Sequence, residues 1–541
     1  MKMTSKYCYI IIFTLALASC SKDKRPNVLL IVADDLGYAD LGCYGSDIHT
    51  PNIDKLASEG IRFTQFHTSP YCAPTRAMLL SGNNNHVAGM GRQAGAPKGS
   101  WEEGKPGYEG HLSDRIVPMP LLLKDAGYHT YMIGKWHLGK EPDQSPYEKG
   151  FERSFSLLQG GGNHYNDIGL IASDSVSQYN ADGSLTEYPT GKYATEFYTD
   201  KLIEFIKSNR SGKPFFAYAA YTSPHWPLQA PAENDKYRGA YDMGYDSLRA
   251  LRFESLKRAG IIPQEQVLPP RLATIKPWGA LTPKEKKIES RKMELYAAMV
   301  DNLDNHIGRL IQFLKDEGLY ENTVIIFMSD NGAAAEDFYN TPPYSNFLTP
   351  RYDNRLENMG SPTSFVSYGP QWAKAGAAPF SHHKSYPTEG GIVAPMIIRG
   401  GKLSATNVIR NDFLSVMDIA PTILELAETS YPGDYASDKI QPMLGTSMRE
   451  YLWGNGSVVH DSTYAIGLEH GGRAYFRKGT WKVVNREAPH RESTFVLFNL
   501  ATDPGEANNM ALRYPEKFAE MMQEWRKYRE EHGILIAPEE Q

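Results

Sequence analysis

Four long apolar runs constrain the fold of this chain more than any other feature of its sequence. They cover 27–35, 128–134, 214–221 and 323–332, and each ends in, or is followed by, polar residues; all are mainly apolar, although 128–134 includes His129 and Thr130. Apolar runs without alternation indicate strands buried on both faces, as in a parallel sheet. A chain of 541 residues can bury a large core in more than one layer. We therefore expect an α/β fold with a large, mostly parallel or mixed sheet sandwiched by helices.

Helical patterns lie between and after these runs. Apolar residues at helical spacing predict helices at 52–58, 118–127, 192–209, 290–318 and from 416 onward. Residues 231–290 are charged, and residues 333–380 are rich in Pro, Tyr, Asn and Gly. We expect 231–290 to be irregular and to cover the active face as an insertion, and 333–380 to form a long ordered loop. Both segments are expected to shape the pocket.

The pattern changes from about residue 455. Short alternating segments at 463–468, 473–478, 481–485 and 495–499 predict a small antiparallel sheet. An amphipathic helix is expected at 515–532, packed on that sheet. The chain is therefore divided into a catalytic domain, residues 27–455, and a C-terminal α+β subdomain, residues 456–541.

The N-terminus has the pattern of an export signal. Lys2 and Lys6 precede an apolar run, 7–18, that is too short to span a membrane. The sequence Leu17-Ala18-Ser19-Cys20 resembles a bacterial lipobox, which implies a signal peptide at 1–19 and a lipid-anchored tether at 20–26. An ordinary signal peptide with a chance cysteine is the alternative. We expect an exported lipoprotein, periplasmic or associated with the outer membrane or cell surface.

The charge balance limits the classes of binding partner, and the cysteine content limits the possible disulfides. The chain has 57 Lys and Arg against 63 Asp and Glu, so no basic bias indicates nucleic-acid binding. Cys8 would leave with the signal and Cys20 would take lipid, so that Cys43 and Cys72 remain in the folded body. An exported protein could pair them in a disulfide. That pairing and a functional role for Cys72 are mutually exclusive.

Polar side chains gather at the ends of the predicted strands. Asp34 and Asp35 end the first run, and Asp330 and Asn331 end the last. Ligands of open α/β sheets collect at the carboxyl ends of the strands. Oxygen donors of this kind favour a hard cation such as Ca²⁺ or Mg²⁺. The alternative for a single aspartate is a helix cap.

The two middle runs end in basic side chains. Lys135 and His137 alternate after the second, so that both could project to one side. His225 follows the third, between two prolines that restrict its backbone, which suits a positioned acid or base. His164 follows three glycines and is a candidate for substrate contact. Lys384 follows Ser381-His382-His383 in a later loop.

The segment Cys72-Ala73-Pro74-Thr75-Arg76 begins an apparent helix and continues to Ser81-Gly82. Pro74 suits the first helical turn. A helix N-terminus lowers the pKa of a thiol and holds anions, and Arg76 lies one turn further along. A buried cysteine before a helix is the plain alternative.

Together these residues resemble the type I sulfatases, of the alkaline phosphatase superfamily fold. The resemblance rests on Cys-x-Pro-x-Arg, on the order of the other site residues over about 27–425, and on the C-terminal sheet. It implies that a sulfatase-maturating enzyme oxidises Cys72 to formylglycine. It also implies a metal held by Asp34, Asp35, Cys72, Asp330 and Asn331. Catalysis and substrate binding would fall to Arg76, Lys135, His137, His225 and Lys384.

The resemblance also implies a mechanism. One hydroxyl of the residue-72 hydrate attacks sulfur, and His225 and Lys384 act at the leaving oxygen. His137 takes the proton of the second hydroxyl, which expels sulfate and restores the aldehyde. Arg76 and Lys135 hold the hydrate and the sulfate oxygens.

The substrate is expected to be a sulfated small molecule or glycan. Export favours an exosulfatase acting on sulfated carbohydrate, with an aryl sulfatase as the alternative. A phosphate or phosphonate ester hydrolase of the same fold is another rival; relatives of that type resemble the phosphatases in placing His where this chain has Asn331. A glycan-binding lipoprotein without activity is the non-enzyme alternative, although no core residue is missing.

Overall fold

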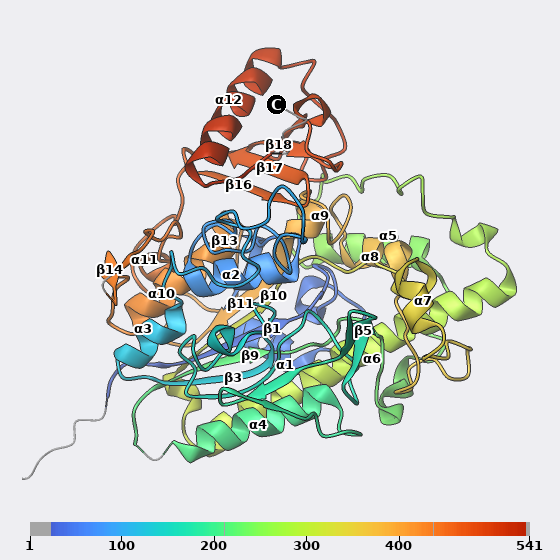
Figure 1. Ribbon diagram of the computed structural model, residues 1–541. Helices are drawn as coiled ribbons and strands as arrows, with labels where there is room; N and C mark the ends of the chain where they lie inside the picture. The colour runs from blue at the N-terminus through green and yellow to red at the C-terminus, as the bar shows by residue number, and fades with distance from the viewer. Residues whose placement is uncertain (1–22, 210, 437, 537–541) are drawn as a thin grey trace, which may run out of the picture.

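The computed structural model describes residues 23–209, 211–436 and 438–536. It consists of a large α/β body and a smaller C-terminal part that stands on it (Figure 1). The predicted signal peptide and Cys20 lie outside the described residues. Among the helices that are described, none is long and apolar enough to cross a membrane.

An eleven-stranded mixed sheet forms the centre of the body. Its five central strands are parallel: β10 (Thr323–Ser329), β1 (Asn27–Ala33), β9 (Phe215–Ala220), β3 (His129–Lys135) and β4 (Arg153–Leu157). The remaining strands extend both edges: β11 (Val393–Arg399), β2 (Ile61–His67), β12 (Val408–Arg410), β13 (Leu414–Ser415), β7 (Tyr179–Ala181) and β8 (Ser184–Thr186). Because β11 runs antiparallel to β10, the sheet is mixed, as expected.

The register of the central strands aligns their carboxyl ends. Val32 of β1 lies opposite Met328 of β10 on one side and Ala220 of β9 on the other. Beyond the strands the pairing continues, since the N–H of Asp330 donates to the carbonyl of Ala33 (3.1 Å). The polar residues that follow each strand therefore emerge at one edge of the sheet.

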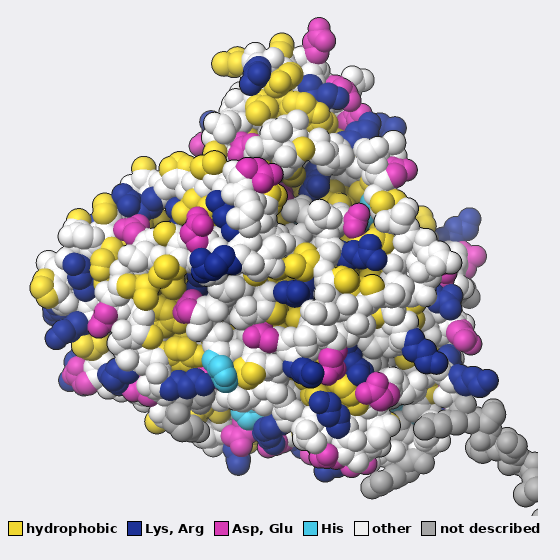
Figure 2. Space-filling view, turned by 180° about the vertical axis from the view of Figure 1, so that it is seen from behind, with side chains coloured by type: hydrophobic (Ala, Val, Ile, Leu, Met, Phe, Trp, Pro, Cys, Tyr) yellow, Lys and Arg dark blue, Asp and Glu magenta, His cyan; other side chains and the backbone are white. Residues whose placement is uncertain are grey.

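Helices cover both faces of the sheet (Figure 1). One layer holds α1 (Pro51–Glu59), α4 (Ala194–Ser208) and α6 (Pro283–Asp316). The other holds α2 (Cys72–Ser81), α3 (Met119–Asp125), α10 (Ile419–Leu426) and α11 (Arg449–Trp453). The face in Figure 2 mixes positive and negative side chains, in keeping with the near-balanced charge.

The expectation of an irregular segment at 231–290 was wrong. That segment contains α5 (Tyr245–Arg258), and α6 already begins at Pro283. The face that α5 buries includes Arg252, which pairs with Asp40 and Asp47, so its sequence lacks a continuous apolar stripe. The start of α6 carries an overlooked signal, a capping box in which Thr282 and Glu285 bond reciprocally.

Residues 333–380 are ordered but are more than a loop, as they contain α7 (Tyr344–Leu348) and α8 (Gly369–Gly376). A separate hairpin, β5 (Ile168–Ile171) with β6 (Asp174–Val176), lies apart from the main sheet. A short pair, β14 (Asp434–Tyr435) with β15 (Asp438–Lys439), completes the body.

The C-terminal part has its own sheet and core. Strands β16 (Ala465–His470), β17 (Arg473–Lys478), β18 (Trp481–Asn485) and β19 (Val496–Asn499) form an antiparallel meander. Helix α12 (Pro515–Glu531) buries Trp525 and Met521 against Phe476 and Leu497 of the sheet. This matches the expected antiparallel sheet with a packed helix, and the boundary at residue 455 stays a prediction.

Candidate active site

The acidic residues meet where β1 and β10 end side by side. Asp34, Asp35, Asp330 and Asn331 are all completely or almost completely buried. The backbone N–H of Asp35 donates to Oδ1 of Asp330 (3.2 Å), and Nδ2 of Asn331 donates to Oδ1 of Asp35 (2.7 Å). Two segments about 300 residues apart in sequence therefore form one polar cluster.

Residue 72 begins α2 and points into this cluster. Its Sγ lies 3.8 Å from Oδ1 of Asp35. Cys43 and Cys72 are both free thiols, so the alternative of a disulfide between them is excluded. Helix α2 is buried along its whole length, which leaves residue 72 little freedom of orientation.

The expected lowering of the Cys72 pKa was wrong. Burial raises the pKa of this thiol, and Asp330 and Asp34 add to the shift, although Lys135 and Lys384 oppose it. The helix N-terminus is thus outweighed by desolvation of the thiolate. An unmodified thiol at this position stays protonated at neutral pH and is a poor nucleophile.

Three buried cations face the three carboxylates. Each pairs with a different one: Arg76 Nη2 with Asp330 Oδ2 (2.7 Å), Lys135 Nζ with Asp34 Oδ2 (2.7 Å) and Lys384 Nζ with Asp35 Oδ1 (2.6 Å). Charges at this depth persist only when they are paired in this way. Burial works to lower the pKa of Lys384, but Asp35 raises it well above its ordinary value, so Lys384 carries its charge at neutral pH.

Arg76 also links two parts of the site. Its Nη1 donates to the carbonyl of Lys135 (2.9 Å), while Nε and Nη2 both donate to Asp330. The guanidinium therefore joins the ends of β3 and β10, in the fork geometry that suits anions.

Two histidines line the cavity in front of residue 72. His225 directs Nε2 to within 3.5 Å of Oδ2 of Asp35, and its Nδ1 bonds the carbonyl of Trp226 (2.5 Å). His137 adopts a positive φ of 58°, and its buried Nδ1 has no hydrogen-bond partner among the residues that the structure describes. Burial lowers the pKa of both rings, that of His225 to about 3, so both are neutral at physiological pH.

The glycine run gives these rings their space. A Cβ on Gly160 would lie 2.6 Å from Nε2 of His137, and one on Gly161 would lie 3.0 Å from Cε1 of His225. A side chain at position 160 would displace the ring of His137, and one at position 161 would displace Leu170 and crowd the ring of His225. Glycine is therefore needed at these two positions because His137 approaches Gly160 closely and His225 approaches Gly161 closely.

His164, also in this segment, does not reach the cavity. It is 1% exposed, and its Nε2 bonds the carbonyl of His225 (3.0 Å). The ring lies behind His225 and supports the turn that carries it. Substrate contact by His164 was the expectation, and the observed contact is with protein backbone instead.

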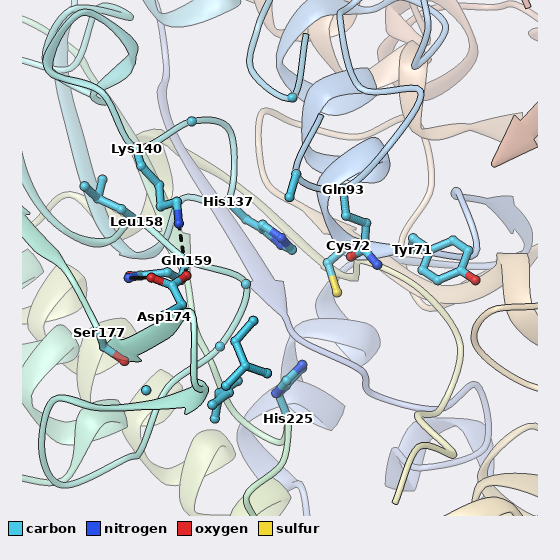
Figure 3. A pocket seen from close by; sticks show the side chains of 18 of the residues that line it. Tyr71, Cys72, Gln93, His137, Lys140, Leu158, Gln159, Asp174, Ser177 and His225 are labelled. Atoms are coloured by element: carbon cyan, nitrogen blue, oxygen red, sulfur yellow. Dashed lines mark hydrogen bonds and ion pairs between the residues drawn. The ribbon is translucent and has the colours of Figure 1, made fainter. Parts of the chain in front are cut away.

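A cavity of about 590 Å³ opens in front of Cys72 (Figure 3). Its inner end is formed by Cys72, His137, His225 and Lys384. Its outer walls are partly apolar and partly polar. The β5–β6 hairpin contributes Leu170, Ile171 and Asp174 to these walls. The other wall residues are Tyr71, Gln93, Glu109, His111, Lys140, Gln159, Trp226, Glu336, Phe338 and Tyr344. A substrate of the size of a sugar or an aryl group fits such a volume.

The site also has the donors of a cation site. Ligand atoms of Asp34, Asp35, Cys72 and His225 lie within 4.8 Å of one another. Oδ1 of Asn331 is buried and has no hydrogen-bond partner in the described part of the chain, which leaves it available as a further oxygen donor. Burial, with a smaller effect of Asp34, raises the pKa of Asp330 to about 6, although Arg76 and Lys135 oppose the shift, so ionised Asp330 is costly at this depth. Carboxylate and amide oxygens of this kind fit a hard divalent cation.

Comparison with known proteins agrees with this geometry. The Sulfatase family matches residues 26–429, and the chain belongs to that family of sulfuric ester hydrolases. It is 42% identical, over 97% of both chains, to an uncharacterized sulfatase of Schizosaccharomyces pombe. It is 40% identical to an arylsulfatase of Klebsiella aerogenes, over 80% of this chain and 93% of that one. The crystal structure of Ps i-CgsB has the same fold, with a TM-score of 0.65 at 25% identity over 93% of this chain and 92% of that one.

Segment 333–380 was expected to shape the pocket, and it supplies Glu336, Phe338 and Tyr344 to the outer cavity walls. The other wall residues were not predicted from the sequence. Lys140 and Asp174 form an ion pair there (3.0 Å), and Gln159 donates to the same aspartate (3.1 Å; Figure 3). Trp226 and Phe338 make an edge-to-face contact on another wall. These residues lie in loops or in the β5–β6 hairpin, whose strands have only four and three residues, so the sequence has no periodicity that would reveal a shared wall.

Proposed function

We propose that this sulfatase acts through the hydrate of a formylglycine formed from Cys72, together with a divalent cation. The ligands would be Asp34, Asp35, Asp330, Asn331 and residue 72, and the cation Ca²⁺ or Mg²⁺. The hydrate supplies a nucleophilic hydroxyl and a second hydroxyl for product release, and the cation stabilises negative charge. The observation that carries the proposal is the convergence of three acids, three cations and two histidines on one buried side chain.

We assign to Arg76 and Lys135 the binding and orientation of the sulfate group. Both are fully buried, and both are held by carboxylates, which fixes their positive charge beside residue 72. They would hold the oxygens of the sulfate group and stabilise the charge that grows on them. Because these groups are already in place, the site needs little reorganisation during the reaction.

His137 is suited to accept a proton. Burial keeps its ring neutral, and the ring lines the cavity that it shares with residue 72. Its Nδ1 has no hydrogen-bond partner within residues 23–209, 211–436 and 438–536, so this nitrogen is free to accept a proton. We assign it the removal of the proton from the second hydroxyl of residue 72.

Lys384 and His225 face the leaving oxygen. Lys384 is charged and donates to both carboxylate oxygens of Asp35 (2.6 and 2.8 Å), and His225 lies against the same carboxylate. Since burial keeps His225 neutral, Lys384 is the better donor of a hydrogen bond or proton to the departing alcohol.

For the substrate we favour a terminal sulfated carbohydrate, cleaved in exo fashion. The outer cavity offers side-chain carboxylates and amides, such as Glu109, Asp174 and Gln159, that suit hydroxyl groups. An aryl sulfate is the second candidate. It is favoured by the aromatic wall of Trp226, Phe338 and Tyr344 and by the similarity to the Klebsiella arylsulfatase.

One substrate panel tests these proposals. Sulfated monosaccharides and disaccharides are compared with 4-nitrophenyl sulfate and its matched phosphate ester, using wild type and Cys72→Ala. We expect turnover of sulfate esters that is lost in Cys72→Ala, with higher kcat/KM for a sugar sulfate than for the aryl sulfate. Preference for the phosphate ester would favour the rival hydrolase, and binding of sulfated sugars without turnover by protein with converted residue 72 would favour a glycan-binding role.

We also propose that the protein is anchored by lipid on Cys20 outside the cytoplasm. The support is the lipobox-like Leu17-Ala18-Ser19-Cys20 after an apolar run. Cys20→Ala should move the protein from the membrane fraction of cells to the soluble fraction. Retention of the variant in the membrane fraction would contradict the anchor.

A further inference from the structure

The turn between β16 and β17 contacts both segments that carry the reacting side chains. Arg473, the first residue of β17, donates from Nη1 to the carbonyl of Ser385 (2.7 Å), directly after Lys384. Its guanidinium also lies over the ring of Tyr386, 4.3 Å from the centroid. On the other side of the turn, the ring of His470 packs on Tyr71 at 4.1 Å, directly before Cys72.

Ser385 is held in an unfavourable backbone conformation. Its φ is +75°, in the left-handed region that residues with a Cβ seldom adopt. Three contacts hold it there: its carbonyl accepts from Arg473, its N–H donates to the carbonyl of Pro70 (3.0 Å), and its Oγ donates to Glu336 (2.8 Å). Such a conformation persists only when the surroundings impose it.

The position of Lys384 depends on this peptide unit. The N–H of Lys384 donates to the carbonyl of Ala333 (3.1 Å), and the Ser385 contacts fix the chain on its other side. With both sides held, Nζ of Lys384 reaches Asp35 at the inner end of the cavity. Release of Ser385 to an ordinary φ would redirect the backbone next to Lys384.

Strand β16 holds the segment that follows α2. Nδ2 of Asn84 donates to the carbonyl of Gly467 (3.1 Å), and Nδ2 of Asn85 donates to that of Glu469 (3.1 Å). The carboxylate of Glu469 bonds Nε2 of His86 (3.1 Å). In Figure 1 this sheet lies directly over the loop after α2 and beside α9. The C-terminal subdomain therefore contacts the helix of residue 72 at both of its ends.

We propose that Arg473 is a positioning residue for the reaction, through which the C-terminal subdomain sets Lys384 against the leaving oxygen. The inference rests on the proposed function for the role of Lys384. It goes beyond that function in making a residue of the other subdomain necessary for the geometry of leaving-group stabilisation. Within the described residues, the side-chain contacts of Arg473 are with Ser385 and Tyr386, and it touches neither residue 72 nor the acid cluster.

A leaving-group series separates positioning from a general structural role. Poor leaving groups need a donor at the departing oxygen, whereas 4-nitrophenolate leaves readily without one. We therefore compare Arg473→Ala, Arg473→Lys and wild type on phenyl sulfate and 4-nitrophenyl sulfate. Lys478→Ala is the matched control, because Lys478 lies on the same strand but pairs with Glu524 of α12, away from the site (2.6 Å). Rates are taken per molecule with converted residue 72, as measured by mass spectrometry.

The expected result is an unequal loss. In Arg473→Ala, kcat/KM for phenyl sulfate should fall about 10²-fold, the usual effect of a small misplacement of a reacting group. The loss for 4-nitrophenyl sulfate should be several-fold smaller. Arg473→Lys, which can still donate one hydrogen bond to Ser385, should recover part of the phenyl sulfate rate, and Lys478→Ala should match wild type. Equal losses for both substrates, or no loss, would overturn the proposal.

Hydrogen exchange gives a readout that does not depend on activity. The amide of Ser385, bonded to Pro70, should exchange faster in Arg473→Ala than in wild type and Lys478→Ala. Unchanged exchange at this amide would contradict the role of Arg473. If wild type lacked sulfatase activity while the exchange difference appeared, the proposed function would fail and the positional link would stand.

Discussion

Lys482 is the cation of a buried cluster that joins the two parts of the protein. Its Nζ lies 2.6 Å from Oε1 of Glu389, at the start of α9 (Glu389–Ile392), and 2.9 Å from Oε1 of Glu506. All three side chains are at most 2% exposed. His67 bonds the other oxygen of Glu389 (3.0 Å). Lys482→Met keeps most of the side-chain volume and removes the charge, so it tests the electrostatic contribution of this cluster.

The loss of unfolding free energy in Lys482→Met follows from the two buried carboxylates that would lose their partner. Removing one partner of a buried ion pair typically costs about 3–5 kcal/mol, because the other charge remains buried and uncompensated. Burial, with Glu389 nearby, already raises the pKa of Glu506 from 4.5 to about 7 even with Lys482 in place. That shift corresponds to about 3 kcal/mol that ionised Glu506 takes from stability above pH 7. Without Lys482, both the rise in the pKa of Glu506 and the stability lost when Glu506 ionises should become larger.

The pH dependence of the loss has a definite sign. Since the folded-state pKa of Glu506 is raised, folding takes up a proton, and stability from this group falls as pH rises from 4.5 to about 7. Glu389 behaves oppositely: although burial alone would raise its pKa, Lys482 and His67 lower it, so its contribution is present above pH 4.5 and lost at lower pH. Lys482→Met weakens the Glu389 contribution and strengthens the Glu506 penalty. The variant should therefore be most destabilised at alkaline pH and partly recover on acidification.

Urea unfolding at about pH 5.5 and about pH 8, followed by circular dichroism and tryptophan fluorescence, measures this difference. Lys478→Met is the control, since its partly exposed pair with Glu524 is worth at most about 1 kcal/mol. A loss in Lys482→Met no larger than in the control would refute the argument. So would a loss of the same size at both pH values, because ionisation of the buried glutamates would then not be its cause.

Three further predictions concern the active site. Cys72→Ser should lack turnover while binding of sulfate esters remains, and mass spectrometry of active wild type should find an aldehyde or its hydrate at residue 72; fully active protein with only thiol there would disprove the assignment. Gly160→Ala should lower kcat about 10²-fold with an unfolding midpoint near that of wild type, because the new Cβ displaces the ring of His137, which lies 2.5 Å from its position; unchanged kcat would contradict the need for close approach. Removal of divalent cations by a chelator should abolish activity and lower the unfolding temperature, with recovery on adding Ca²⁺ or Mg²⁺; full activity in metal-free protein would contradict a cation at Asp34 and Asp35.

The sequence predicted the sheet and the inner site because both depend on local signals. Buried strands such as β1 and β10 are continuous apolar runs, and parallel strands place whatever follows them at one edge. Asp35 and Asn331 could therefore be expected to meet without knowledge of the strand order. The observed hydrogen bond between them, at 2.7 Å, additionally requires β1 and β10 to be neighbours in the sheet, which the sequence does not show.

Other features depend on tertiary contacts that have no local pattern. Helix α5 was missed because it buries Arg252 against acids from a distant loop. The thiol pKa was assigned the wrong direction because the helix N-terminus is a local feature, whereas burial of Cys72 is a property of the whole fold. The same holds for His164, whose partner is the backbone of a residue 61 positions away.

The division between the two parts of the chain is therefore less simple than their separate cores suggest. The α/β body contains every side chain at the inner end of the cavity, yet Lys384 and Glu389 lie on one segment that the C-terminal sheet holds through Arg473 and Lys482. If both links act as inferred, they should differ in kind: the buried ion pair sets stability, and the guanidinium contact sets geometry. Lys482→Met should then lower the unfolding free energy while the ratio of phenyl to 4-nitrophenyl sulfate rates stays near that of wild type, and Arg473→Ala should change that ratio with a smaller effect on unfolding.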